Sequence, residues 1–276
     1  MGWNGATAVV TGGASGIGKA LSLAMAERGA LVVVTDIDEG GAQAVAAACG
    51  PKALARKLDV RDAEAVRKVV EDAARLTGQL DYLFNNAGIG IGGEVQELTV
   101  AHWDRIVDIN IRGVIHGVQA AYPLMVKQRS GHIVNTASLA GLGATPLLSP
   151  YSMSKHAVVG LSISLRAEAA ALGVRVSALC PAAIETPILD SDNPADLPAT
   201  SWRPNLRRFL GKLGGPPYPV DKCALEALAA VDANEGVIVL PARARLLFRL
   251  GRMLPMLAEK AAIDAVAGER AAKKLR

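Results

Sequence analysis

A tyrosine and a lysine stand four residues apart in Tyr151-Ser-Met-Ser-Lys155. Residues at this spacing share one face of a helix, so the ammonium group can lie beside the phenol. A free tyrosine has a pKa of about 10, and a neighbouring positive charge favours its phenolate. The pair therefore predicts proton transfer to and from a substrate oxygen. The alternative is an accidental pair, because this spacing is common on helices.

Ser138 and Asn110 are the polar residues that extend this candidate site. Ser138 follows the apolar run His132–Asn135 and precedes Tyr151 in the chain. A hydroxyl at a strand end can donate to a substrate oxygen and stabilise developing negative charge. Its alternative is a turn serine before Ala140-Gly141. Asn110 lies in a helical stretch, where asparagine is mildly unfavourable, so it serves the site, satisfies buried backbone groups, or does both.

A glycine-rich turn, Thr11-Gly-Gly-Ala-Ser-Gly-Ile-Gly18, lies between the apolar run Ala8–Val10 and a helical pattern. Gly12 allows a tight turn, Gly16 lets the backbone approach a phosphate, and Gly18 permits close packing of helix on strand. The start of a helix offers unpaired N–H groups and a partial positive charge to a pyrophosphate. Strand, turn and helix in this order predict dinucleotide binding rather than an ordinary glycine-rich turn.

An acid follows the next apolar run: Asp36 comes after Leu31–Val34. A carboxylate at this place can accept hydrogen bonds from adenosine ribose hydroxyls and would repel a 2′-phosphate. The chain has no lysine or arginine between Gly12 and Gly18, or at Ile37, to pair with such a phosphate. These residues favour NAD over NADP as the cofactor. The alternative for Asp36 alone is a solvated acid at a strand end.

Short apolar runs alternate with amphipathic stretches through most of the chain. The expected strands are Ala8–Val10, Leu31–Val34, Ala53–Leu58, Tyr82–Phe84, His132–Asn135, Val174–Leu179 and Val237–Leu240. The expected helices are Gly18–Arg28, Glu39–Cys49, Ala63–Thr77, Val100–Gln128, Tyr151–Leu172 and Val220–Asn234. Strands that are apolar on both faces are buried between two helical layers. The alternation predicts an α/β fold with a doubly wound parallel sheet.

The composition fits a single domain with a large core, since 51% of the 276 residues are hydrophobic and 20% are charged. Three cysteines at unrelated spacings indicate a reducing, cytoplasmic location. No metal site is expected, because the histidines do not cluster in the sequence; they are His102, His116, His132 and His156. The net charge of +4 is concentrated in residues 241–276, and no aromatic-rich or zinc-type motif indicates nucleic-acid binding.

The spacing of the glycine turn resembles that of the classical short-chain dehydrogenases/reductases. The other matching segments follow in family order from about residue 6 to 240; they are Asp59-Val60, Asn85-Asn-Ala-Gly88, Asn110, Ser138, Tyr151-Ser-Met-Ser-Lys155, Pro181 and Thr186. The resemblance implies a Rossmann fold and an NAD-dependent oxidoreductase acting on a secondary alcohol or ketone. It implies that Tyr151 is the general acid/base, Lys155 lowers its pKa and holds the nicotinamide ribose, Ser138 orients the oxygen and Asn110 holds a relay water.

The resemblance also implies a set of cofactor-binding residues. These are Gly12, Ser15, Gly16, Ile17, Gly18, Asp36, Ile37, Asp59, Val60, Asn86, Ala87, Gly88, Tyr151, Lys155, Ile184 and Thr186. Family members usually form homodimers or homotetramers through helices that match Val100–Gln128 and Tyr151–Leu172. The chain departs from the family at Ala182, where glycine is usual and the added methyl narrows the pocket. The competing hypothesis is a non-catalytic dinucleotide sensor or scaffold, which has no reason to keep all four catalytic-type residues.

The segment Thr186–Pro219 is unusually long and rich in proline for a connection. It follows a strand at its carboxyl end, where ligands of open α/β sheets bind, so residues 187–215 are expected to form a substrate lid. Its apolar residues predict a bulky apolar substrate; they are Ile188, Leu189, Leu197, Trp202, Leu206, Phe209 and Leu210. Its basic residues keep an anionic or thioester-linked substrate open; they are Arg203, Arg207, Arg208 and Lys212.

The expected Rossmann-type domain covers residues 1–240, and residues 241–276 form a separate basic tail. An apolar stripe at helical spacing in this tail predicts an amphipathic helix; its members are Leu246, Leu247, Leu250, Met253, Leu254 and Leu257. Pro255 is expected to break or kink that helix. Packing on the pocket rim or on a partner subunit is favoured over the alternative, docking on an anionic membrane surface.

Overall fold

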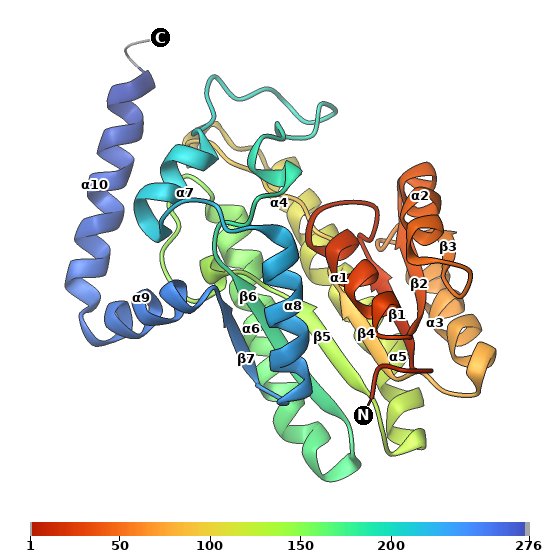
Figure 1. Ribbon diagram of the computed structural model, residues 1–276. Helices are drawn as coiled ribbons and strands as arrows, with labels where there is room; N and C mark the ends of the chain where they lie inside the picture. The colour runs from red at the N-terminus through yellow and green to blue at the C-terminus, as the bar shows by residue number, and fades with distance from the viewer. Residues whose placement is uncertain (1, 274–276) are drawn as a thin grey trace.

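The computed structural model describes residues 2–273, so residue 1 of the expected domain and residues 274–276 of the expected tail lie outside it. Seven parallel strands form one sheet in the order β3-β2-β1-β4-β5-β6-β7 (Figure 1). They are β1 (Thr7–Thr11), β2 (Leu31–Asp36), β3 (Leu54–Lys57), β4 (Tyr82–Asn85), β5 (His132–Thr136), β6 (Arg175–Pro181) and β7 (Val237–Leu240). The predicted doubly wound sheet is confirmed. The strand order reverses between β1 and β4, which is where such folds open a ligand crevice.

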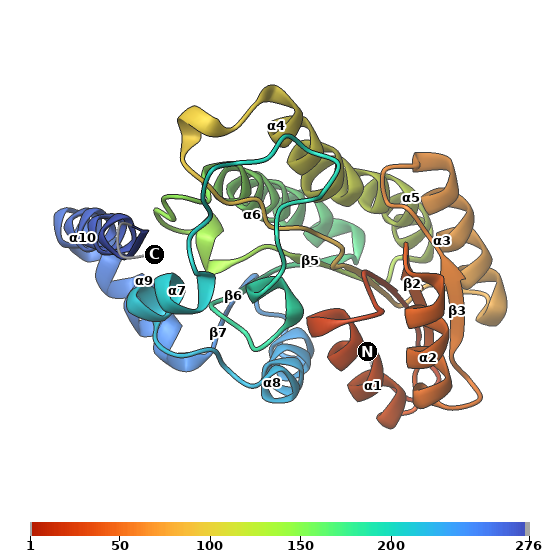
Figure 2. The same cartoon turned by 90° about the horizontal axis from the view of Figure 1, so that it is seen from above.

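Helices cover both faces of the sheet, as Figure 2 shows from above. One layer consists of α1 (Gly16–Glu27), α2 (Glu39–Cys49) and α8 (Val220–Asp232). The opposite layer consists of α3 (Ala63–Thr77), α5 (Gly113–Gln128) and α6 (Ser149–Ala169). Strand β1 has apolar contacts on both sides, because Ala8 and Val10 pack in the first layer and Val9 in the second. Burial on both faces explains why these strands are continuous apolar runs.

Local sequence signals define several helix ends. Asp62 caps α3 by accepting hydrogen bonds from the backbone N–H groups of Glu64 and Ala65, each 3.0 Å long. Gly78 ends the same helix in the left-handed conformation with φ of 87°. Between these caps, Val66, Val70 and Ala73 form the buried stripe.

The expected helix Val100–Gln128 is interrupted. It consists of α4 (Val100–Ile106), a π-helical turn (Val107–Arg112) and α5. A π-turn widens the helix by one residue and frequently occurs at functional sites. Here the turn contains Asn110, whose side chain is fully buried. Hydrophobic periodicity alone could not predict this turn.

The remaining elements are short or lie toward the C-terminus. Three-residue 3₁₀ turns occur at Val95–Glu97, Leu139–Gly141, Ala170–Leu172 and Pro187–Leu189. The sequence did not predict helix α7 (Leu206–Gly214), which lies inside the expected lid. Its N-terminus is capped by Asn205, whose side chain accepts a 2.9 Å hydrogen bond from the N–H of Arg208.

The tail forms two helices, α9 (Ala242–Met253) and α10 (Pro255–Lys273). The break before Pro255 is the one that the proline predicted. Helix α10 packs along α7, beyond the β7 edge of the sheet (Figures 1 and 2). Through residues 2–273, no helix is both long and apolar enough to cross a membrane.

Candidate active site

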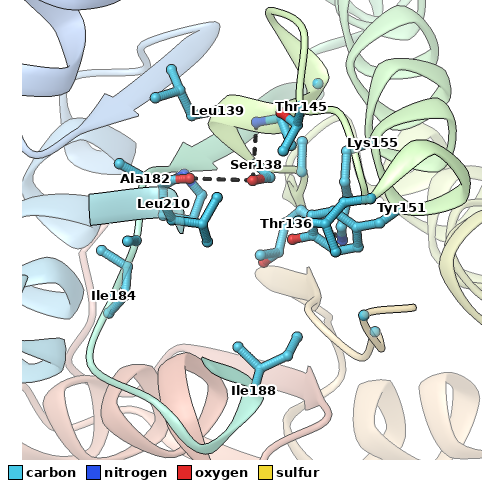
Figure 3. Close-up of a pocket in the computed structure, with 18 of the residues that line it drawn as sticks. Thr136, Ser138, Leu139, Thr145, Tyr151, Lys155, Ala182, Ile184, Ile188 and Leu210 are labelled. Atoms are coloured by element: carbon cyan, nitrogen blue, oxygen red, sulfur yellow. Dashed lines mark hydrogen bonds between the residues drawn. The ribbon is translucent and has the colours of Figure 1, made fainter. Parts of the chain in front are cut away.

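A cavity of about 1290 Å³ lies at the carboxyl edge of the sheet. It extends from the glycine turn before α1 to the helices of the C-terminal tail, and Figure 3 shows its central part. All the predicted site residues line it except Gly18 and Asn110. The topology therefore gathers residues from positions 12 to 186 around one space.

The glycine turn depends on residues without a Cβ. Gly12 has a positive φ of 64°, and a Cβ there would lie 2.7 Å from the Cα of Ala87. A Cβ at Gly18 would overlap the carbonyl oxygen of Gly12, so Gly18 packs inside the turn rather than lining the cavity. Ser15 is the N-cap residue of α1, and its side chain accepts no capping hydrogen bond within residues 2–273. The first N–H groups of a helix have no partner within the helix, and Ser15, Gly16 and Ile17 at the start of α1 line the cavity.

Hydrogen bonds tie the turn to the loop after β4. The hydroxyl of Thr11 accepts from the backbone N–H groups of Asn86 and Ala87, each at 3.0 Å. The side-chain amide of Asn86 donates to the carbonyl oxygens of Thr11 and Gly12, each at 3.1 Å. These bonds hold the ends of β1 and β4 together at the crevice, and so fix this part of the cavity wall.

The carboxylate of Asp36 is held at one end of the cavity. Its oxygens accept 3.0 Å hydrogen bonds from the backbone N–H groups of Ala14 and Asp38. These two bonds leave lone pairs on both oxygens for a hydroxyl-bearing ligand. Ile37, the next residue, is 59% exposed and lines the same end.

Two arginines line the cavity near Asp59, and both have acidic partners. The guanidinium group of Arg61 donates to the two oxygens of Asp59 at 3.0 and 2.9 Å, and it holds the pKa of that carboxyl below its usual value. Arg105 pairs with Asp196. Asp59 is a predicted cofactor-binding residue, and the sequence did not indicate that its carboxylate would form an ion pair with Arg61.

Ser138, Tyr151 and Lys155 converge on the middle of the cavity (Figure 3). The hydroxyl of Ser138 accepts from the N–H of Ala140 at 3.1 Å and donates to the carbonyl oxygen of Pro181 at 3.4 Å. The Nζ of Lys155 donates to the carbonyl oxygen of Thr136 at 2.8 Å and lies 5.5 Å from the centre of the Tyr151 ring. The serine comes from the end of β5, and the other two residues come from the first turns of α6.

Burial dominates the acid–base properties of this group. It raises the pKa of Tyr151, an effect that the hydrogen bond with Ser138 partly offsets. Burial also lowers the pKa of Lys155 to about 8. In this arrangement the lysine bonds to Thr136 and the phenol is desolvated, so the lowering of the Tyr151 pKa by Lys155 stays a prediction.

Asn110 lies behind the cavity wall and bonds to protein groups. Its side-chain amide donates to the carbonyl oxygen of Ile89 at 3.0 Å and to the hydroxyl of Ser154 at 3.1 Å. Its oxygen accepts from the N–H of Ile89 at 2.9 Å. A Cβ on Gly88 would lie 3.2 Å from that oxygen and 3.4 Å from the Nζ of Lys155. Asn110 therefore satisfies buried backbone groups close to the lysine, which was one of its two predicted uses.

The family model described as short chain dehydrogenase matches residues 6–196. This chain belongs to that family. Cyclohexanol dehydrogenase of Acinetobacter sp. strain SE19 is 36% identical over 218 residues, which are 78% of this chain and 84% of that protein. The resemblance that the sequence motifs indicated is thus confirmed.

Two solved structures extend the comparison to three dimensions. A short-chain dehydrogenase/reductase of Burkholderia phymatum in complex with NAD has a TM-score of 0.83 and 30% identity, covering 93% of this chain and 96% of its own. A 3-ketoacyl-(acyl-carrier-protein) reductase of Brucella melitensis complexed with NADH has a TM-score of 0.77 and 32% identity, covering 87% and 99%. The single-domain Rossmann-type fold with its C-terminal helices is therefore that of a short-chain dehydrogenase.

The far end of the cavity in this short-chain dehydrogenase is lined mainly by apolar residues. Part of its wall comes from Leu139, Leu142, Leu148, Ile188, Leu210 and Leu213. The tail adds residues that the sequence did not assign to the site: the apolar Leu247, Phe248, Leu250, Leu254, Leu257, Ala258 and Ala262, and the charged Arg252 and Glu259. The apolar stripe of the tail was the available signal, but it did not say which surface the stripe would cover.

Two ion pairs fasten α10 over this apolar end. Arg208 of α7 donates to both oxygens of Glu269 at 2.6 and 2.7 Å, and the side chain of Glu269 is fully buried. Arg270 donates to both oxygens of Glu94 at 2.8 Å. The arginines hold the pKa values of both carboxyls below their usual range, so the pairs are formed at neutral pH. We call these two ion pairs the latch.

Two of the four basic residues of the expected lid form ion pairs with protein acids. Arg207 pairs with Glu185 and Asp190, and Arg208 pairs with Glu269. Arg203 lies outside the cavity wall, and within residues 2–273 its buried Nε has no hydrogen-bond partner.

Proposed function

We propose that this chain is an NAD-dependent oxidoreductase that transfers hydride between a bulky, apolar secondary alcohol or ketone and nicotinamide. The observation that carries the proposal is the convergence of Ser138, Tyr151 and Lys155 in the cavity that also contains the glycine turn. The similarity to a cyclohexanol dehydrogenase supports an alcohol on a carbon ring as the reacting group.

The residues of the cavity fit a dinucleotide. The free N–H groups at the start of α1, beside Ser15 and Gly16, would hold the pyrophosphate. Asp36 would accept hydrogen bonds from the adenosine ribose, and Lys155 would donate to the nicotinamide ribose. Ile184 and Thr186 would lie against the carboxamide end, beside the methyl of Ala182. When bound, the nicotinamide ring supplies the hydride acceptor or donor that protein side chains lack.

Proton transfer falls to the chain's own residues. In the oxidation direction, the phenolate of Tyr151 takes the hydroxyl proton as the hydride leaves the carbon. Ser138 donates a hydrogen bond to the same substrate oxygen, and reduction reverses these steps. Because burial raises the pKa of Tyr151, the nearby charge of Lys155 is needed to stabilise the phenolate. Asn110 holds the Ile89 backbone next to this lysine, where a relay water would connect it to solvent.

The direct test is turnover of NAD with a panel of secondary alcohols and ketones. Steady oxidation of ring alcohols by the wild type, and loss of this turnover in the Tyr151→Phe variant, would support the proposal. The competing hypothesis is a dinucleotide sensor or scaffold. NAD binding without turnover of any panel member, in protein that is folded, would favour that hypothesis instead.

Asp36→Ala should narrow the preference for NAD over NADP. The carboxylate that accepts from the Ala14 and Asp38 backbone would no longer repel a 2′-phosphate. We expect the wild type to favour NAD, and the ratio of the two kcat/KM values to fall by about tenfold or more in the variant. Glu39→Ala, an exposed acid of α2 outside the cavity, is the matched control. A wild-type preference for NADP would refute this assignment of Asp36.

Glu269→Gln should weaken the latch and raise KM for bulky substrates. The substitution keeps the shape of the buried side chain but removes the charge that pairs with Arg208. We expect an increase in KM of about threefold for decahydro-2-naphthol and little change for cyclohexanol, because only the larger ring reaches the tail wall. Asp264→Asn, an exposed acid on the same helix, is the control. Equal effects on both substrates would exclude α10 from the substrate pocket.

We also propose a cytoplasmic location and a homo-oligomer. All three cysteines are free, which suits a reducing compartment. The helices expected to form subunit contacts carry exposed apolar side chains, with Ile115 on α5 exposed by 40% and Ile163 on α6 by 51%. Burying such side chains in a subunit interface is more favourable than leaving them exposed to water in a monomer.

A further inference from the structure

Helix α9 carries two stripes at the same spacing on opposite sides. Ala244, Phe248 and Gly251 form the inner stripe, in which Ala244 is buried and Phe248 packs against the core. Leu246, Leu250 and Met253 form the outer stripe, and they are exposed by 60%, 45% and 76%. An ordinary surface helix turns its larger apolar residues inward. Here only Phe248 is a large apolar residue on the inner side, whereas three large apolar residues remain exposed on the outer side.

The exposed apolar surface continues around the bend into α10. Leu254, Met256 and Leu257 are exposed by 51%, 81% and 61%. We call the seven outward residues of this bend the elbow; they are Leu246, Arg249, Leu250, Met253, Leu254, Met256 and Leu257. A contiguous apolar surface of this kind marks an interaction site rather than ordinary surface.

The charge of the elbow region is entirely positive. Residues 242–258 contain four arginines and no acidic residue. Arg249 is exposed and lies one turn from both Leu246 and Met253, so the positive charge is within the apolar face. Exposed apolar side chains combined with arginine are typical of helices that lie in the interface of an anionic membrane.

The elbow also joins the cavity. Leu250, Leu254 and Leu257 line the cavity and are at the same time exposed. The apolar surface therefore leads from the outer face of α9 to the end of the cavity where the wall is formed by Leu210 and Leu213. A partner that covers the elbow would lie at the opening of this apolar end.

We propose that the elbow docks on an anionic lipid surface, with α9 lying in the interface and the apolar end of the cavity facing the lipid. A second copy of the chain fits this surface less well. A two-fold contact would pair the elbow with itself and bring the Arg249 side chains of both copies together, without an acid in the elbow to pair with them. Entry of an apolar substrate from the membrane would follow only if the proposed function is correct. The docking itself does not depend on the proposed function.

The test is co-sedimentation of the full chain with vesicles of phosphatidylcholine alone or with phosphatidylglycerol at an equal share. We expect pelleting only with the anionic vesicles, and its reduction in high salt. The double variant Leu246→Glu/Met253→Glu and the single variant Arg249→Glu should each weaken partitioning by about fivefold or more. The controls are Val100→Glu, at a 73% exposed apolar position on α4, and Lys68→Glu on α3.

Three outcomes would overturn the proposal. The first is the absence of pelleting with anionic vesicles, and the second is an equal loss of pelleting in the elbow and control variants. The third is a wild-type oligomer that dissociates in the Leu246→Glu/Met253→Glu variant while neither form binds lipid. The last would assign the elbow to a second copy. Quenching of protein fluorescence by NADH shows that each variant is folded, since the elbow lies away from Asp36 and the glycine turn. The vesicle assay needs no turnover, so an inactive enzyme would refute the proposed function and leave the docking result standing.

Discussion

Tyr151→Phe should lower kcat by about 10²- to 10⁴-fold while NAD still binds. The variant keeps the ring beside Ser138 but removes the phenolic oxygen that, under the proposed function, exchanges a proton with the substrate oxygen. The space around the ring is unchanged, so the glycine turn and Asp36 should hold the dinucleotide as before. Steady-state kinetics gives kcat, and fluorescence titration gives the dissociation constant for NAD.

The matched control is Tyr122→Phe, the same change at a partly buried tyrosine of α5 away from the cavity. It should retain the activity of the wild type. A Tyr151→Phe enzyme with kcat within a few-fold of the wild type would remove this tyrosine from the acid–base role. Loss of NAD binding along with activity would instead indicate that the phenol supports the cofactor site.

Lys155→Met should reduce both kcat and NAD affinity. The side chain is 3% exposed, and its Nζ lies between the Thr136 carbonyl and the Tyr151 ring. Methionine has a similar length and no charge, so the phenolate loses its stabilising cation and the ribose its donor. We expect kcat to fall by about 10²-fold or more and the dissociation constant for NAD to rise by about tenfold. Lys127→Met, at an exposed lysine near the end of α5, is the control.

The pH dependence separates this role from a merely structural one. Burial places the pKa of Lys155 at about 8, so its ammonium form is present below that pH and lost as the pH rises through it. NAD affinity of the wild type should therefore fall as the pH rises through about 8, and the step should be absent in Lys155→Met. An identical step in the variant would show that another group titrates there.

Local chemistry and periodicity were enough to predict the sheet and its helical layers, while much of the candidate cofactor site, such as Asp59 and Val60, was implied by the family resemblance. The backbone of the turn has a positive φ at Gly12 and Gly16, which favours glycine, and Tyr151 and Lys155 share a helix face through their spacing alone. Strands of a parallel sheet end at one edge, so residues that follow different strands, such as Asp36 and Ser138, had to meet there. These features depend on short-range rules that the residue types express directly.

Other features depend on contacts between residues that are far apart in the chain. The π-turn around Asn110 is coupled to its hydrogen bonds with Ile89, and the pKa values of the catalytic-type residues follow from how deeply the fold buries them. Neither can be derived from a local window of sequence, because desolvation is a property of everything that packs around a group.

The tail shows this division within a single segment. The sequence determined its first, amphipathic helix, its positive charge and the break before Pro255. An apolar stripe on a helix favours burial against another apolar surface, but it does not specify which surface that is. The tertiary structure decided that the ion pair between Arg208 and Glu269 would hold α10 against α7, and that the outer stripe of α9 would stay exposed. The physical reason is that the packing of a helix depends on the shape of the facing surface and on partner residues distant in sequence. The residues of the stripe alone specify neither of these.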